Sequence, residues 1–178
     1  LSNGRFFRGK LRGATVEATG EVIFNTSMTG YQEILTDPSY TGQIVTMTYP
    51  QIGNYGVNLD DMESKTTHAS ALIVRELSHI SSNWRATQTL DEWLIERRIP
   101  VLEGVDTRSL VKAIRSSGEC SGLLVPLDSR HTLDELREEA LDLPSMIGQN
   151  LARQVSTRES YFWPSEAETK PFNVIAYD

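Results

Sequence analysis

Short hydrophobic runs dominate the first half of the chain and have the spacing of β-strands. Gln43–Tyr49 alternates most cleanly, with Ile44 and Thr46 on one side and Val45 and Met47 on the other, and Pro50 ends it. The other runs are rich in β-branched or aromatic residues, or are short and apolar as in a sheet covered on both faces. The strands predicted in this half are Arg5–Arg12, Gly20–Thr26, Gln43–Tyr49 and Ser70–Arg75.

Helical spacing becomes common only after residue 88. Thr89 followed three residues later by Glu92 is a capping box, and it precedes an apolar stripe that begins at Leu90. A second helix is predicted from a cap at Asp106 or Thr107 to a stop at Gly118. Another capping box at Thr132–Glu135 begins a third helix. Strands are expected at Ile99–Val105 and Ser121–Leu127, and residues 143–170 are weakly patterned and expected to wrap the surface.

The last segment, Phe172–Asp178, is an apolar run that ends in an acid. This pattern is typical of the first buried strand of an α/β domain. We therefore expect a domain that spans residues 1–170, followed at 171–178 by a linker and the first strand of a domain missing from this chain.

Composition narrows the possible functions. The chain has 178 residues, 39% hydrophobic and 23% charged, as in ordinary globular domains. Its net charge of -7 argues against binding nucleic acid, because phosphates would be repelled. The one cysteine, Cys120, permits no intramolecular disulfide, and no run is long enough to span a membrane. These features predict a cytoplasmic protein that contacts neither nucleic acid nor membrane.

The sequence alone reveals no self-contained catalytic set and no metal site. The three histidines, His68, His79 and His131, lie far apart, and motifs for nucleotide binding are absent. The acidic run Asp60–Glu63 is interpreted as a solvated loop rather than a calcium site. Cys120 is interpreted as a packed thiol, since no base stands near it in the sequence.

Ser39 follows Asp37-Pro38, which is a strong turn signal, and from the pattern alone it is a turn hydroxyl. Its surroundings carry more information. The stretch Asn25–Tyr40, continuing through Gln43–Thr46 and Tyr49–Asn54, closely resembles the N-terminal region of the small subunit of glutamine-dependent carbamoyl-phosphate synthetase. Further segments resemble the same family, so that the resemblance covers essentially the whole chain: Gly20–Phe24, Gly104–Leu110 and Phe172–Asp178.

The resemblance implies a fold, an α/β (α+β) domain with three β/β/α layers of the "swivelling" type. It also implies an activity of the complete complex, which makes carbamoyl phosphate from glutamine, bicarbonate and ATP for pyrimidine and arginine biosynthesis. In that family the small subunit hydrolyses glutamine and passes ammonia to the large subunit, which uses ATP and Mg. The first domain binds no cofactor.

In the family, the catalytic Cys, His and Glu belong to a second, class I amidotransferase domain, whose Gly-x-Cys-x-Gly motif this chain lacks. The resemblance therefore implies that this chain has no catalytic residue and is inactive alone. Its partners would be the large subunit, its own amidotransferase domain and L-glutamine, for which Ser39 would be a binding residue.

Two other hypotheses stay open at this point. The chain could be a stand-alone ligand-binding module that reuses the same fold. It could also be a serine hydrolase centred on Ser39 with His68, although no nucleophile elbow surrounds the serine.

Overall fold

A computed structural model describes residues 1–127, 131–163 and 172–177. The chain forms two compact units, Leu1–Gly148 and Gln149–Asp178. In the first unit the strands are β1 (Lys10–Gly13), β2 (Ala18–Asn25), β3 (Gln43–Met47), β4 (Gln51–Ile52), β5 (Ala71–Val74), β6 (Glu76–Leu77), β7 (Pro100–Glu103) and β8 (Ser121–Leu124). The helices there are α1 (Tyr31–Thr36), the 3-10 helix η1 (Pro38–Tyr40), α2 (Leu90–Glu96), α3 (Thr107–Ser117) and α4 (Leu133–Asp142).

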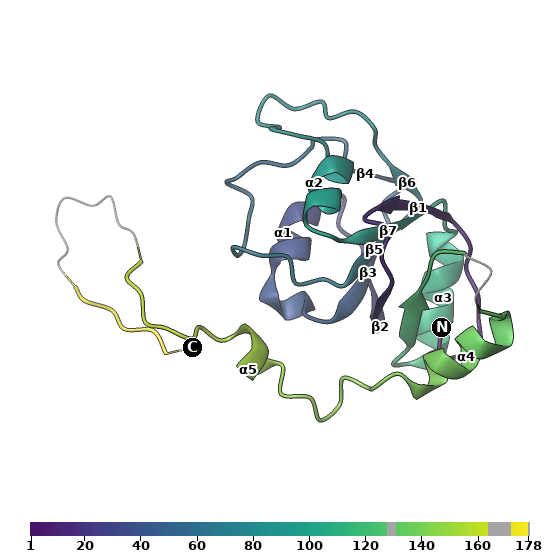
Figure 1. Cartoon of the computed structure of the whole chain (residues 1–178). Coiled ribbons are helices and arrows are strands. Elements are labelled where there is room, and N and C mark those ends of the chain that lie inside the picture. Colours follow the sequence, from purple (N-terminus) through teal and green to yellow (C-terminus); the bar gives the residue numbers. More distant parts are fainter. Residues whose placement is uncertain (128–130, 164–171, 178) are drawn as a thin grey trace. The chain divides into compact units, whose positions relative to one another are not determined.

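Within the described residues, six strands form one mixed sheet in the order β1-β7-β5-β3-β2-β8. The four inner strands β7, β5, β3 and β2 run parallel, and the outer strands β1 and β8 are antiparallel to their neighbours. Strands β4 and β6 form a separate parallel pair. The mixed α/β class and the strand-rich first half are thus confirmed (Figure 1).

Alternation along the inner strands divides the core into two clusters. Val45 and Met47 of β3 face one cluster, which also contains side chains of α1, α2, β4 and β6, whereas Ile44 faces the other. Leu110 and Ile114 of α3 pack in that second cluster. The central strands are therefore covered on both faces, which explains why β3 is buried on both sides. Helices α1 and α2 lie on one side of the sheet and α3 on the other (Figure 1).

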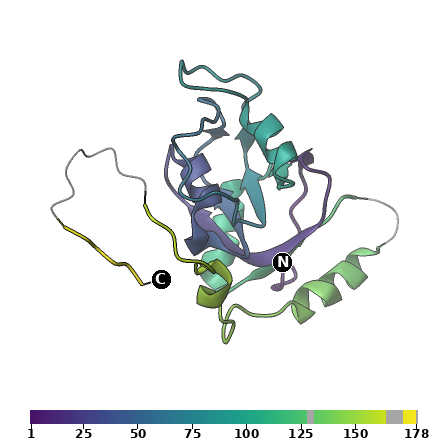
Figure 2. The ribbon, with the colours of Figure 1, turned by 60° about the vertical axis from the view of Figure 1, so that its left-hand side comes forward.

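The helices predicted after residue 88 are present, with their caps. The Thr89 hydroxyl accepts from the Glu92 N–H and the Glu92 carboxylate accepts from the Thr89 N–H; Thr132 and Glu135 repeat this arrangement at α4. Asp106 is the cap of α3, and Gly118 ends it. Helix α4 packs beside β8 (Figure 2).

The sequence prediction differed from the structure at several places in the first unit. The pair β4 and β6 was not predicted, and the strand expected at Ser121–Leu127 ends at Leu124. The Arg5–Arg12 strand begins only at Lys10, where pairing with β7 starts. Helix α1 was not predicted at all. Its cap residue is Gly30, which has a left-handed φ of 82° and no side chain to mark the start of a helix.

The second unit contains one element that the pattern did not indicate, the short helix α5 (Ala152–Val155). Residues 172–177 have no regular secondary structure, and their side chains are exposed. Residues 164–170 of the weakly patterned segment, and residues 171 and 178 of the expected linker and strand, lie outside the described residues. The boundary at residue 170 and the missing domain stay predictions. No helix in the described part of the chain is long and apolar enough to cross a membrane.

Candidate functional site

Ser39 occupies the middle of η1, a tight turn between α1 and β3. The Asp37 carboxylate accepts a hydrogen bond from the Ser39 N–H at 2.8 Å and so caps the turn, while Pro38 fixes the backbone at its first position. The Ser39 side chain is exposed. Within the described residues its hydroxyl makes no hydrogen bond. The turn thus presents a hydroxyl that a ligand can use as donor or acceptor.

The far end of the turn is held by side chains from a distant segment. The Thr41 hydroxyl donates to the Pro38 carbonyl at 2.7 Å, and its oxygen lies 3.1 Å from Nδ1 of His68. Nε2 of His68 lies 3.0 Å from the Ser64 hydroxyl. No hydrogen bond joins His68 to Ser39 among the described residues. The pair therefore lacks the contact between nucleophile and base that a serine hydrolase needs.

The site lies at the amino ends of the parallel strands. The turn leads through Gly42 directly into β3, and His68 precedes β5, the neighbour of β3 in the sheet. The Gly42 N–H donates to the His68 carbonyl at 3.3 Å, and Gly42 has a left-handed φ of 75°. A Cβ added to Gly20 of β2 would lie 2.2 Å from the Gly42 carbonyl oxygen. Close approach between β2 and this turn therefore requires glycine.

Helix α1, which leads into the Ser39 turn, is anchored by two stacked tyrosines. The rings of Tyr31 and Tyr55 are 4.2 Å apart at 20°. The Tyr55 hydroxyl accepts from the Gly30 N–H at 2.6 Å and from the Tyr31 N–H at 3.4 Å, in the place of a helix cap. The Tyr31 hydroxyl donates to the Gly56 carbonyl at 2.6 Å.

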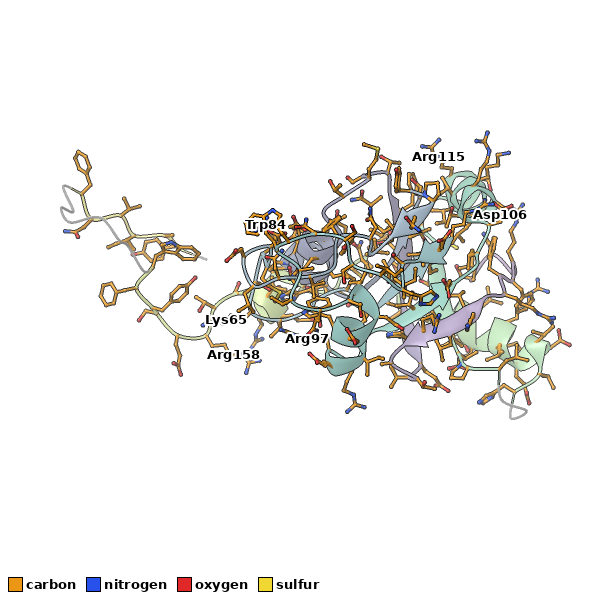
Figure 3. The ribbon with its side chains drawn as sticks, turned by 90° about the horizontal axis from the view of Figure 1, so that it is seen from above. Lys65, Trp84, Arg97, Asp106, Arg115 and Arg158 are labelled. Atoms are coloured by element: carbon orange, nitrogen blue, oxygen red, sulfur yellow. The ribbon has the colours of Figure 1, made fainter. Side chains whose placement is uncertain are left out.

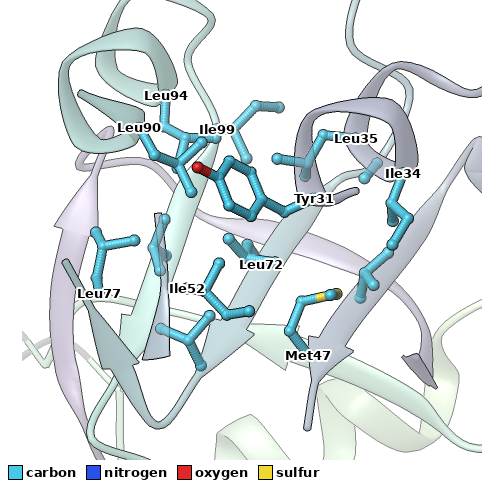
Figure 4. Packing of buried hydrophobic residues seen from close by; sticks show 14 of the residues in the cluster. Tyr31, Ile34, Leu35, Met47, Ile52, Leu72, Leu77, Leu90, Leu94 and Ile99 are labelled. Atoms are coloured by element: carbon cyan, nitrogen blue, oxygen red, sulfur yellow. The ribbon is translucent and has the colours of Figure 1, made fainter. Parts of the chain in front are cut away.

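Tyr31 itself is fully buried between α1 and α2 (Figure 4). Burial raises the pKa of both tyrosine hydroxyls, and for Tyr31 the neighbouring Tyr55 adds to the rise. Both hydroxyls therefore stay protonated and act as fixed hydrogen-bonding groups. Much of the hydroxyl-rich stretch supports the fold in this way; Tyr40, for example, accepts from the Asn25 side chain at 3.2 Å.

The acidic run Asp60–Glu63 is occupied by protein contacts. Asp61 accepts from the Asn58 side chain at 2.7 Å and from Arg85 at 2.8 Å. The hydrogen bond from Asn58, together with Arg85, lowers the pKa of Asp61. The loop is held again where Arg97 donates to the Lys65 carbonyl at 3.2 Å, and Figure 3 labels both residues. No group of three or more His, Cys, Asp or Glu side chains among the described residues could hold a metal ion.

The remaining candidates lie in other surroundings. Cys120 is buried, and among the described residues its sulfur is in hydrogen-bond contact with the Ser2 hydroxyl at 3.7 Å and the Ser121 carbonyl at 3.8 Å, neither of which is a base. His79 contacts Arg12, whose guanidinium forms an ion pair of 3.1 Å with Glu103. His131 is exposed. The structure does not bring any of these side chains into hydrogen-bond contact with the Ser39 turn.

The sequence reasoning identified Ser39 and its turn but missed the Thr41, His68 and Ser64 contacts. Twenty-seven residues separate Thr41 from His68. No local pattern marks such a contact, since it depends on the pairing of β3 with β5.

Comparison with known proteins identifies related sequences. The family profile described as "Carbamoyl-phosphate synthase small chain, CPSase domain" matches residues 1–124. A carbamoyl phosphate synthase small chain from Syntrophotalea carbinolica is 52% identical over an alignment of 189 residues, which covers 100% of this chain and 50% of the relative. The Aquifex aeolicus protein of that name is 48% identical, with 92% and 43% covered, and the Escherichia coli one is 44% identical, with 100% and 50% covered. The chain spans about half the length of the curated relatives it matches.

Proposed function

Because the chain belongs to the carbamoyl-phosphate synthase small chain family, we propose that it is the N-terminal domain of a small subunit that supplies ammonia from glutamine. The complete cytoplasmic complex would use that ammonia, bicarbonate and ATP to make carbamoyl phosphate for pyrimidine and arginine biosynthesis. A large subunit would bind ATP and Mg. The alignment, which covers all of this chain and half of the relatives, supports this division of labour.

The role of this domain would be to complete the glutamine site, with Ser39 as the residue that contacts glutamine. The observation that carries this proposal is the exposed Ser39 hydroxyl, which makes no hydrogen bond within the described residues although its backbone is fixed by Asp37 and Pro38. A rigidly held hydroxyl can donate to the α-carboxylate of an amino acid or accept from its ammonium group. Little conformational entropy is then lost when the ligand binds.

Hydrolysis of glutamine would depend on groups outside this chain. The thiol of Cys120 is buried, and its hydrogen-bond partners among the described residues, the Ser2 hydroxyl and the Ser121 carbonyl, are not bases. We therefore expect the isolated chain to hydrolyse no glutamine. Hydrolysis by the isolated chain that disappears in Cys120→Ala would contradict this assignment.

The test of the Ser39 proposal uses the full-length small chain assembled with its large subunit. Ser39→Ala should raise the KM for glutamine about five-fold or more, the effect of losing one hydrogen bond, and change kcat little. Synthesis from added ammonium salt bypasses glutamine and should be unchanged. Ser27→Ala, which removes another exposed serine hydroxyl of the same stretch, is the matched control. Equal KM values for Ser39→Ala and the parent protein would contradict the proposal.

A further inference from the structure

His68 is attached to the Ser39 turn through both its backbone and its side chain. Its carbonyl accepts from the Gly42 N–H at 3.3 Å, and its own N–H donates to the Leu35 carbonyl, near the end of α1, at 2.9 Å. Its ring bridges the Thr41 and Ser64 hydroxyls. This one residue therefore connects the helix before the turn, the residues after it and the loop that leads to β5.

The protons of this network can be assigned from its acceptors. The Thr41 hydroxyl has one proton, and the Pro38 carbonyl, at 2.7 Å, accepts it. The Thr41 oxygen can then only accept from His68, which requires the proton of the imidazole to be on Nδ1. The opposite nitrogen, Nε2, lies 3.0 Å from the Ser64 hydroxyl, whose own proton is directed to the Thr36 carbonyl at 2.7 Å. It also lies 3.4 Å from the Thr66 hydroxyl, which can donate to it when the imidazole proton is on Nδ1. The order of donation is thus from His68 to Thr41 and from Thr41 to the Pro38 carbonyl.

This order matters because the Pro38 carbonyl belongs to the turn itself. Asp37 holds the Ser39 N–H at the start of η1, and Thr41 holds the preceding carbonyl, that of Pro38, from the other end. The peptide that joins Pro38 to Ser39 is therefore fixed by hydrogen bonds on both sides. The Pro38 carbonyl also accepts from the Thr41 backbone N–H at 3.1 Å, but its shorter contact, at 2.7 Å, is with the hydroxyl. Without the hydrogen bond from His68, the Thr41 hydroxyl can rotate away from Pro38, and the direction of the Ser39 side chain is less well defined.

The geometry points to His68 as a positioning residue that acts through Thr41 to orient the Ser39 hydroxyl toward glutamine. This inference rests on the proposed function of Ser39 as a glutamine-binding residue. His68 touches neither substrate nor reacting atoms in this assignment, and its effect is on glutamine affinity. Thr41 is the intermediate in the chain, so that removing either member should have the same consequence.

Two substitutions at His68 separate the Nδ1 contact from the Nε2 contact. In His68→Asn the side-chain NH2 group is bonded to Cγ, as Nδ1 is, so that it can still donate to Thr41, whereas the contact with Ser64 is lost. In His68→Gln the amide reaches further and replaces Nε2 instead. Thr41→Val removes the hydroxyl at nearly constant volume. Thr87→Val, which removes a threonine hydroxyl that donates to the Val57 carbonyl at 3.0 Å, is the matched control.

The experiment measures KM and kcat for glutamine in the full-length small chain assembled with its large subunit, with Ser39→Ala as reference. We expect His68→Gln and Thr41→Val each to raise KM about five-fold with kcat within about two-fold, and the double variant to be no worse than either alone. His68→Asn should stay within about two-fold of the parent KM, as should Thr87→Val. Synthesis from ammonium salt should be unchanged in every variant.

The outcomes distinguish this inference from the proposal on which it rests. If Ser39→Ala leaves KM unchanged, the glutamine-binding role of Ser39 is wrong. If Ser39→Ala raises KM but Thr41→Val does not, Ser39 binds glutamine without help from His68 and the present inference is overturned. Equal KM values for His68→Asn and His68→Gln would also overturn it, because a role confined to packing or stability does not distinguish the two ring nitrogens. If a His68 variant fails to assemble, the KM values of Thr41→Val, which lacks the hydroxyl, and of Thr41→Ser, which keeps it, are compared instead. Equal KM values for these two variants would overturn the inference.

Discussion

Replacing Tyr55 with phenylalanine tests whether the Tyr55 hydroxyl caps α1, the helix that precedes the Ser39 turn in the chain. The ring and its stack on Tyr31 are retained, so that the change removes only the hydroxyl. That hydroxyl accepts from the Gly30 N–H at 2.6 Å and, more weakly, from the Tyr31 N–H at 3.4 Å. Because Gly30 provides no side-chain cap, no other side chain among the described residues accepts from the Gly30 and Tyr31 N–H groups at the start of α1.

The expected cost follows from these contacts. One hydrogen bond contributes about 1 kcal/mol net, and leaving its donor without a partner adds a desolvation cost of about 1–3 kcal/mol when the donor is fully buried. Gly30 is only partly buried, so water can replace part of the loss. We therefore expect Tyr55→Phe to lower the free energy of unfolding by about 1–2 kcal/mol. For a protein of this length this corresponds to a fall in Tm of about 3–6 °C.

Thermal unfolding of the 178-residue chain, followed by circular dichroism, measures the effect. Tyr49→Phe is the control, because Tyr49 is 38% exposed and its hydroxyl makes no hydrogen bond within the described residues. Its Tm should stay within about 1 °C of the parent, as for most surface substitutions. If Tyr55→Phe unfolds at the same temperature as Tyr49→Phe, the Tyr55 hydroxyl does not cap α1, and the explanation of that helix given above is wrong.

Three further predictions concern other contacts. The hydrogen bond from Asn58 lowers the pKa of Asp61, so the ionised Asp61 stabilises the fold above the ordinary aspartate range near pH 4, and this stabilisation is lost as pH falls through the lowered pKa. Asp61→Asn cannot lose it, so the Tm of this variant, measured from pH 7 to 2.5, should fall less steeply below pH 4 than the Tm of the parent. Gly20→Ala places a Cβ 2.2 Å from the Gly42 carbonyl oxygen and should cost about 1–3 kcal/mol in urea unfolding; an unchanged midpoint would mean that the strands separate easily. Thr89→Ala removes the cap of α2 and should cost about 1 kcal/mol in the same assay, whereas Thr89→Ser should restore most of it.

The elements that could be predicted from the sequence are those whose cause is local. The alternation in Gln43–Tyr49 predicted β3 because successive side chains enter different core clusters. The capping boxes at Thr89 and Thr132 predicted α2 and α4, since cap and partner are three residues apart. The Ser39 turn was predicted for the same reason, because the side chain that caps it belongs to Asp37, two residues away.

The elements that could not be predicted depend on distant residues. Helix α1 has six residues, too few for a clear period, and the group that caps it belongs to Tyr55, 25 residues after Gly30. Strands β4 and β6 have only two residues each, too few for a pattern, and their pairing depends on the larger sheet that brings the two segments together. The contact between His68 and Thr41 likewise requires β3 and β5 to be neighbours.

The Ser39 turn lies at the amino ends of the parallel strands, and this position determines where the protein can be altered without affecting the turn. Ligands of open α/β sheets usually bind at the carboxyl ends of the strands, where the loops vary most. Here the loops that leave the carboxyl ends of β3 and β7 begin at the opposite edge from Ser39. Insertions, epitope tags or fluorescent labels placed in those loops therefore leave the turn untouched. Gly104 itself should be kept in such variants, because its left-handed φ of 86° would be strained by any side chain even though the surrounding space is open.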